Sequence, residues 1–189
     1  MSIHKKHTTL IATSTIIYLV LTTIIAILPA FEAEKTPPLA GIVEPTVEVS
    51  NGRELYMEEG CGTCHTQFVR DLPVDRAYGR GSLPGDYALE DPPMLGTQRT
   101  GPDLSNVGKR QPSQIWNLIH LYNPRAVVPS SVMPGYPWLF EIKESAGEND
   151  VVVPVPAAFK PAGSIVIAKQ EALDTVSYLQ SLKQVEVSK

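Results

Sequence analysis

The sequence contains only two cysteines among its 189 residues, and both lie in the stretch CGTCH that begins at Cys61. Histidine is also scarce, with four residues in the chain. A structural zinc site needs four ligands, and here it would have to recruit His120, because His4 and His7 lie before a long apolar segment. The scarcity of both residue types therefore argues against a structural zinc site.

The sequence also lacks an excess of basic residues. Lys and Arg together number 16 against 20 Asp and Glu, so the net charge is -4 and the isoelectric point is about 5.6. A nucleic-acid-binding protein would show a basic face or stripe, so no nucleic-acid partner is expected. A mildly acidic surface is ordinary for a soluble domain and indicates no partner.

Charged residues are absent from Thr8 to Phe31. At about 1.5 Å per helical residue, the roughly 20 residues from Leu10 to Pro29 would cross a hydrocarbon core of about 30 Å. The threonines and the serine in this stretch are tolerable, because a hydroxyl can donate to a carbonyl of its own helix. The stretch predicts a single transmembrane helix.

The flanking charges predict the orientation of this helix. Lys5 and Lys6 precede it, and Glu32, Glu34 and Lys35 follow it, so the amino terminus is expected in the cytoplasm and the rest of the chain outside. A cleaved signal peptide is the alternative, but its apolar region usually runs over about 7 to 15 residues. The length of this stretch favours a retained anchor.

The rest of the chain has no internal repeat, and its length suits one domain with a real core. A Pro-rich tether is expected after the anchor. The predicted division is an anchor over residues 1–31, a tether over 32–45 and a globular domain over 46–189.

Helical patterns dominate the predicted domain. The first helix follows Ser50 or Asn51 as its cap, the second follows Ser113 and ends at Pro124, and the third covers residues 168–183 with an apolar stripe. No long strand pattern competes, although DVVVPVP could form a short extended piece. The domain is expected to be mostly helix and loop.

The CGTCH stretch matches the attachment signature of c-type haem. In that signature the two thiols, here Cys61 and Cys64, add to the haem vinyl groups, and the adjacent imidazole, here His65, ligates the iron. A thioredoxin-like dithiol would need a βαβ context that is missing, and a disulfide this short would stabilise little. The stretch therefore predicts one covalently bound haem c in an extracytoplasmic domain.

The sixth position of the iron has four candidates: Met57, Met94, Met133 and His120. Met57 precedes the attachment site on the same helix and is expected on the proximal side. Met133 lies in VPSSVMPGYPW, a Pro-rich loop that could cross the distal face of the haem. We expect Met133 to be the ligand rather than Met94, and His120 to pack on its helix. His/Met ligation closes the iron to small molecules and suits electron transfer.

Four motifs carry a resemblance to a known family: GRELYMEEGCGTCHTQFVR, RTGPDLSNVG, LYNPRAVVPSSVMPGYPWL and ALDTVSYLQSL. In this order they resemble the monohaem subunit II of cbb3-type cytochrome c oxidases, which belong to the heme-copper oxidases. The resemblance implies a single transmembrane helix followed by a class I cytochrome c-like haem domain, with Met133 as the sixth ligand. The segment over residues 141–170 is shorter than is common in the family.

The resemblance also implies further contacts with the cofactor. The carbonyl of Pro102 in the GPDL motif would accept a hydrogen bond from His65 and so tune the iron. Arg70 and Arg99 flank the family motifs in a long irregular segment, and a guanidinium matches the carboxylate of a haem propionate. Arg125 could bind a propionate as well, or dock a partner.

The function implied is that of a membrane-anchored electron carrier without oxygen chemistry of its own. It would pass electrons from a donor cytochrome c to the haem of an integral-membrane catalytic heme-copper subunit, on the periplasmic side of the bacterial inner membrane. The cytochrome c subunit of a nitric oxide reductase is the nearest alternative. A haem-based sensor would need an open sixth site, and a free shuttle would lack the anchor.

Overall fold

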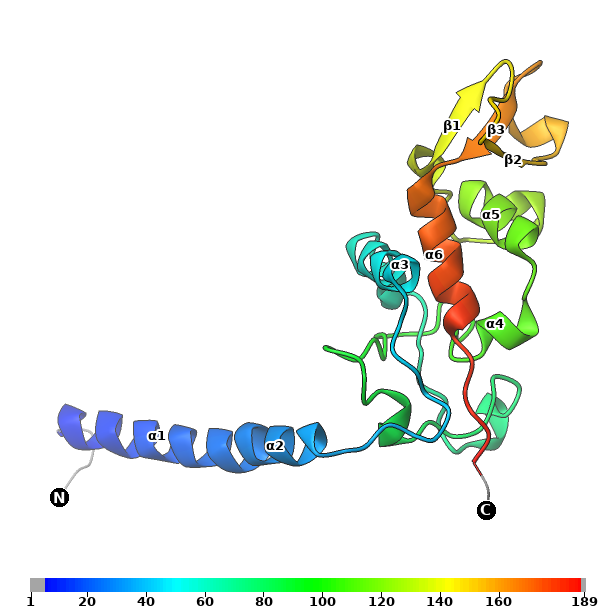
Figure 1. The fold of residues 1–189 in the computed structure, drawn as a ribbon. Helices are drawn as coiled ribbons and strands as arrows, with labels where there is room; N and C mark the ends of the chain where they lie inside the picture. Colours follow the sequence, from blue (N-terminus) through cyan, green and yellow to red (C-terminus); the bar gives the residue numbers. More distant parts are fainter. Residues whose placement is uncertain (1–5, 188–189) are drawn as a thin grey trace. The chain divides into compact units, whose positions relative to one another are not determined.

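The computed structural model describes residues 6–187, and Figure 1 shows its helices and short strands. The α-helices are α1 (His7–Thr22), α2 (Leu28–Glu34), α3 (Val47–Glu58), α4 (Val107–Arg110), α5 (Gln114–Tyr122) and α6 (Gln170–Ser181). The strands are β1 (Phe140–Lys143), β2 (Val151–Val153) and β3 (Ile165–Ala168). The mainly helical class predicted from the sequence is confirmed.

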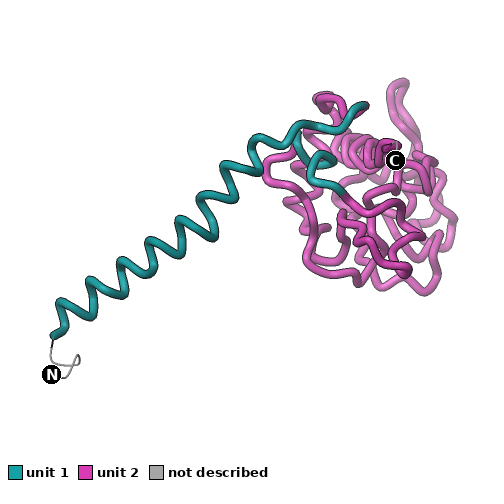
Figure 2. The backbone as a smooth tube through the Cα atoms, turned by 90° about the horizontal axis from the view of Figure 1, so that it is seen from below, with its two compact units in different colours: residues 1–40, 83–89 teal, residues 41–82, 90–189 magenta. Residues whose placement is uncertain are grey.

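The chain forms two compact units, which Figure 2 draws in different colours. One consists of Met1–Ala40 with Leu83–Leu89, and the other of Gly41–Ser82 with Glu90–Lys189. Within the first unit, the Leu39 N–H donates to the carbonyl oxygen of Gly85 at 3.1 Å. The predicted division into anchor, tether and domain stays a prediction.

The first unit contains one continuous helical stretch from His7 to Glu34, in which a π-helical turn joins α1 to α2. Its length and apolar composition are sufficient to cross a membrane. The Thr13 and Thr23 hydroxyls donate to the carbonyls four residues earlier at 2.8 Å, as the sequence predicted. Because these hydroxyls are satisfied inside the helix, they add little cost in an apolar environment.

The second unit is built around the crossing of α3 and α6, which lie side by side in Figure 1. The Tyr56 and Tyr178 rings meet edge to face, with centroids 5.3 Å apart, and Asn51 donates to Asp174 at 3.2 Å. The prediction that Ser50 or Asn51 caps α3 was wrong. Thr46 is the cap, because its hydroxyl accepts from the Val49 N–H and starts the helix a turn earlier.

Helix α5 begins and ends as predicted. The Ser113 hydroxyl caps it by accepting from the Trp116 N–H at 3.2 Å, and Pro124 follows its last turn. Leu118 and Tyr122 are buried against α6 and the sheet, whereas Ile115, in the first turn, is 54% exposed.

A three-stranded antiparallel sheet occupies the segment before α6, and the sequence pattern did not predict it. The strand order is β1-β3-β2, with Phe140 and Val151 both opposite Ala168. One face of the sheet packs into the core with α5 and α6. The strands have only three or four residues, too short for an alternating pattern, and only the expected extended piece at DVVVPVP matches one of them.

The long segment between the cysteine motif and α4 is held from the carboxyl end of the chain. The Gln184 side chain is buried, accepting from Asn106 Nδ2 at 2.7 Å and donating to the Arg80 carbonyl at 3.0 Å. The Gln67 amide donates to the Tyr178 hydroxyl at 2.9 Å. These bonds order an irregular segment by using side chains that come much later in the sequence.

Candidate haem site

The turn that carries the two thiols follows α3 directly. Gly60 ends the helix in a left-handed conformation, with φ at 69°, which a residue with a Cβ adopts only at a cost. The N–H groups of Cys64 and His65 then donate to the Cys61 carbonyl at 3.2 and 3.0 Å. Both cysteines are free thiols, so the disulfide alternative is not formed. One short turn therefore presents two thiols and an imidazole.

The Cys61 thiol is poorly suited to redox exchange. Burial and then the charge of Glu59 raise its pKa to about 11, although a hydrogen bond with Tyr136 acts in the opposite direction. Reactive dithiols depend on a lowered thiol pKa, because the thiolate is the nucleophile. The environment of Cys61 therefore disfavours the thioredoxin-like alternative.

The imidazole of His65 is held in one orientation. Its Nδ1 atom lies 2.8 Å from the carbonyl oxygen of Pro102, as the resemblance implies. A carbonyl oxygen can only accept, so Nδ1 carries the proton and Nε2 keeps a lone pair for a metal. Gly101 packs on the ring so closely that a Cβ at this position would lie 2.2 Å from His65 Cε1.

Further hydrogen bonds join this turn to the GPDL motif. The Gly101 N–H donates to the Cys64 carbonyl at 2.9 Å, and the Leu104 N–H donates to the Thr66 carbonyl at 2.8 Å. The Asp103 carboxylate is fully buried and accepts from the Thr66 hydroxyl at 2.6 Å. The position of Pro102 relative to His65 is therefore fixed from both sides.

Arg70 and Arg99, expected at haem propionates, both bind a protein carboxylate in this structure. The Arg70 side chain donates twice to Asp75, at 2.9 Å each, and Arg99 Nη1 donates to Asp75 at 2.6 Å. Arg99 also donates to the Thr66 hydroxyl, the Phe68 carbonyl and Asp103. Hydrogen bonds from Arg70 and then Arg99 hold the pKa of Asp75 well below its usual range. Their contact with propionates stays a prediction.

The candidate methionines lie in different surroundings. Met133 is partly buried and packs against the core cluster that contains α5, and its N–H donates to the Ser131 hydroxyl at 3.2 Å. Met94 packs with Cys61 against a different cluster, and a Cβ built on Gly62 would lie 3.7 Å from its Cε. Met94 therefore lies against the attachment turn, whereas Met133 belongs to a separate loop.

His120 packs on its own helix, as the sequence predicted. Its ring stacks on that of Trp116, with centroids 4.6 Å apart and an angle of 12° between the planes. Burial, followed by the nearby charge of His65, lowers the pKa of His120 to about 4. His120 therefore lies within electrostatic reach of His65, and α5 borders the site.

These residues fit a c-type haem. Two free thiols on one turn can each form a thioether, and the His65 tautomer leaves Nε2 for iron. No cluster of three or more His, Cys, Asp or Glu that could hold a metal ion occurs within residues 6–187. That finding leaves the zinc alternative without a ligand set in this part of the chain.

A comparison with protein families gives a match over residues 1–160 to the family described as cytochrome C oxidase, mono-heme subunit/FixO. The chain belongs to this family. The monohaem subunit of cbb3-type oxidases is thus the group to which the sequence motifs pointed. A search of curated proteins finds no match.

Membership gives the monohaem subunit one haem and a place in a membrane-bound cytochrome c oxidase complex. The helical stretch from His7 to Glu34 fits single-pass anchoring of such a subunit. The family match ends at residue 160, so β3 and α6 lie beyond it.

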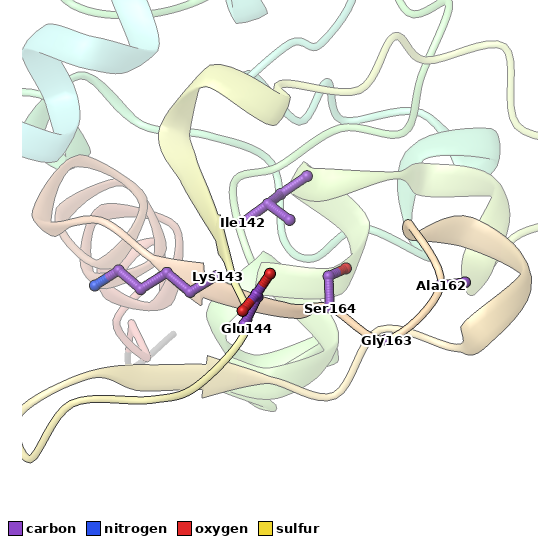
Figure 3. A pocket seen from close by; sticks show the side chains of 6 residues that line it. All are labelled: Ile142, Lys143, Glu144, Ala162, Gly163 and Ser164. Atoms are coloured by element: carbon purple, nitrogen blue, oxygen red, sulfur yellow. The ribbon is translucent and has the colours of Figure 1, made fainter.

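Sequence reasoning missed several residues around the site. Glu59 accepts a hydrogen bond from Trp138, and Tyr136 lies beside Cys61, yet none of the three has a spacing that signals such contacts. Figure 3 shows a separate hollow lined by Ile142, Lys143, Glu144, Ala162, Gly163 and Ser164. Lys143 there is paired with Asp150 at 2.9 Å, and the lining contains none of the predicted haem residues.

Proposed function

We propose that this monohaem subunit attaches its haem through Cys61 and Cys64 and ligates the iron through His65 and Met133. Each thiol adds across one vinyl group, so that an S–C bond forms and the thiol hydrogen passes to the other vinyl carbon. The bound haem supplies a one-electron Fe(III)/Fe(II) couple. The protein residues would hold it and orient its ligands.

The observation that supports this proposal most strongly is the bond between His65 and Pro102. A neutral histidine that donates from Nδ1 to a backbone carbonyl is the usual arrangement of a metal-ligating imidazole. The same short segment carries both thiols, and Gly101 leaves room for the ring. If His65 only packed in the fold, the two free cysteines that precede it would have no role.

Met133 completes the proposed ligand set from a loop that is separate in sequence from the attachment turn and packs against a different core cluster. A thioether ligand raises the potential of a haem iron and closes its sixth position, which suits electron transfer. The domain would then accept an electron from a donor cytochrome c. It would pass that electron to the haem of an integral-membrane heme-copper subunit and would reduce no oxygen itself.

The proposed location is the bacterial inner membrane, with the amino terminus in the cytoplasm and the haem domain in the periplasm. Lys5 and Lys6 precede the apolar stretch and Lys35 alone follows it closely, and this bias of basic residues supports the orientation. A periplasmic domain would also have its thiols in the compartment where c-type haem is attached.

The proposal includes binding of the haem propionates by Arg70 and Arg99, and Arg70 is the better candidate of the two. The Arg70 side chain is 50% exposed, whereas that of Arg99 is 19% exposed and bound to several acceptors. Arg70 can therefore turn toward a propionate at a smaller cost than Arg99.

The experiment that tests the proposed function uses the complex that copurifies with the full chain in mild detergent. Ascorbate and a redox mediator supply electrons, and oxygen uptake is compared with nitric oxide uptake. Fast, cyanide-sensitive oxygen consumption is expected. Turnover of nitric oxide alone would overturn the oxidase assignment while leaving the haem ligands in place.

A second measurement addresses the electron-transfer role. The reduced chain is exposed to carbon monoxide, and His/Met ligation predicts no binding. Rapid binding would contradict a closed sixth position and favour a sensor.

A further inference from the structure

The loop that carries Met133 has its own anchors. Residues 128–136, here called the methionine strap, leave the turn at Pro124–Ala126 and end where the Tyr136 N–H donates to the Leu121 carbonyl at 2.8 Å. The backbone bond of Met133 goes to Ser131, which belongs to the strap itself. That bond does not fix Met133 relative to the thiols, so contacts beyond the strap must do so.

Trp138, two residues after the strap, reaches the segment that bears the thiols. Its indole Nε1–H donates to Glu59 Oε1 at 2.8 Å. Glu59 is the C-cap of α3 and precedes Cys61 by two residues. This hydrogen bond directly joins the exit of the methionine strap to the entrance of the attachment turn.

The backbone around Trp138 is held as well. Its carbonyl accepts from the Lys169 side chain at 2.8 Å, and the Lys169 N–H donates to the Leu139 carbonyl at 3.1 Å. Lys169 is the N-cap of α6. Trp138 therefore connects the strap, α3 and α6 at one point.

Tyr136 lies between Trp138 and the thiol. Its ring meets the Trp138 ring edge to face, with centroids 5.3 Å apart and an angle of 69°. Burial is the main cause that raises the pKa of Tyr136 to about 12, and the neighbouring Cys61 and Glu59 act in the same direction. Tyr136 therefore lies beside both partners of the hydrogen bond, Trp138 and Glu59.

We propose that Trp138 and Glu59 are positioning residues that hold the methionine strap over the haem, and so keep Met133 on the iron. The inference rests on the proposed His65 and Met133 ligation. Trp138 is 53% exposed, so burial alone does not explain the position of its side chain. The hydrogen bond from its indole N–H to the Glu59 carboxylate, beside the attachment turn, explains that position.

The expected effect follows from the strength of one charge-assisted hydrogen bond in a partly exposed position. Loss of this bond should raise the population with Met133 off the iron by about fivefold to tenfold. An external ligand that binds only the open form would then bind tighter by the same factor.

The test is a titration of the ferric, haem-loaded full chain with imidazole, which competes with methionine for iron. Trp138→Phe keeps an aromatic ring but removes the donor, and Glu59→Ala removes the acceptor. Glu59→Gln keeps an oxygen that can accept but loses the charge, so its imidazole affinity should lie between those of the wild type and Glu59→Ala. Glu58→Ala is the matched control, because it removes the neighbouring exposed carboxylate of the same helix.

The proposal expects imidazole to bind Trp138→Phe and Glu59→Ala about fivefold to tenfold more tightly than the wild type. The double variant should exceed neither single variant by more than twofold, because one bond is lost in each case. Equal affinity in Glu59→Ala and Glu58→Ala would overturn the proposal. Additive effects of the two substitutions would do so too.

The methionine-to-iron charge-transfer band separates this inference from the proposed ligation. If the wild type lacks the band, the ligand assignment itself fails. If the wild type shows the band and Trp138→Phe changes neither the band nor the imidazole affinity, the ligation stands and the positioning role is wrong.

Discussion

The Nδ1 atom of His65 and the carbonyl oxygen of Pro102 lie 2.8 Å apart, although 37 residues separate them in the chain. The contact sets the protonation of the imidazole, because only Nδ1 can donate to a carbonyl. It also requires Gly101 to pass directly against the ring. A small residue thereby controls the orientation of the proposed iron ligand.

Gly101→Ala should displace the imidazole, because its Cβ would lie 2.2 Å from His65 Cε1. The expected result is a chain that retains less than about half of the wild-type haem per protein, and that unfolds at lower denaturant concentration. The ratio of haem absorbance to protein measures the effect. Gly147→Ala is the control, since its nearest neighbour would lie at an ordinary 3.5 Å.

Met133→Leu should abolish the methionine-to-iron charge-transfer band and lower the reduction potential, because leucine fills similar space without a sulfur ligand. The ferrous variant should bind carbon monoxide. Met94→Leu should keep the band, since Met94 packs against Gly62 in the other cluster. An unchanged band in Met133→Leu and a lost one in Met94→Leu would reverse the assignment.

Arg99→Met should destabilise the domain, because Asp75 and Asp103 are buried and would lose a charged partner. Loss of one partner of a buried ion pair predicts a Tm lower by about 10 °C. Thermal unfolding followed by circular dichroism gives the value. Arg76→Met, at an exposed position, should change the Tm by no more than about 2 °C.

The Asp75 carboxylate should make stability depend on pH in the acid range. Its pKa is lowered in the folded state by Arg70 and Arg99, so the unfolded chain binds a proton first as the pH falls. The stability contributed is complete above about pH 5 and declines below about pH 4 toward the lowered folded pKa.

Urea titrations of the wild type and Asp75→Asn at several pH values test this dependence. The difference in unfolding free energy between the two should shrink as the pH falls below about 4. Asp71→Asn removes an exposed carboxylate nearby and serves as the control. A difference that stays constant from pH 6 to about pH 2 would contradict the role of Asp75.

The features that sequence reasoning predicted depend on local signals. The CGTCH motif is contiguous, and the Ser113 hydroxyl accepts a hydrogen bond from an N–H only three residues later. The apolar stretch near the amino terminus is recognised by counting its residues. Each signal lies within a few residues or a single helix, so the rest of the fold was not needed to recognise it.

The features that were missed depend on distant partners. The strands are short, and β3 pairs with both β1 and β2 across intervening loops. No sequence pattern reveals that Asp75 lies between Arg70 and Arg99 and accepts from both. Trp138 and Glu59 are likewise 79 residues apart.

The hydrogen bonds from the carboxyl end of the chain impose an order on folding. Gln67 and Tyr178, which are 111 residues apart, can meet only after nearly the whole chain has been made. Until then the segment after the thiols lacks the partners that order it, and Cys61 and Cys64 stay open to modification. Late closure by the last helix would give haem attachment time to finish before the fold becomes rigid.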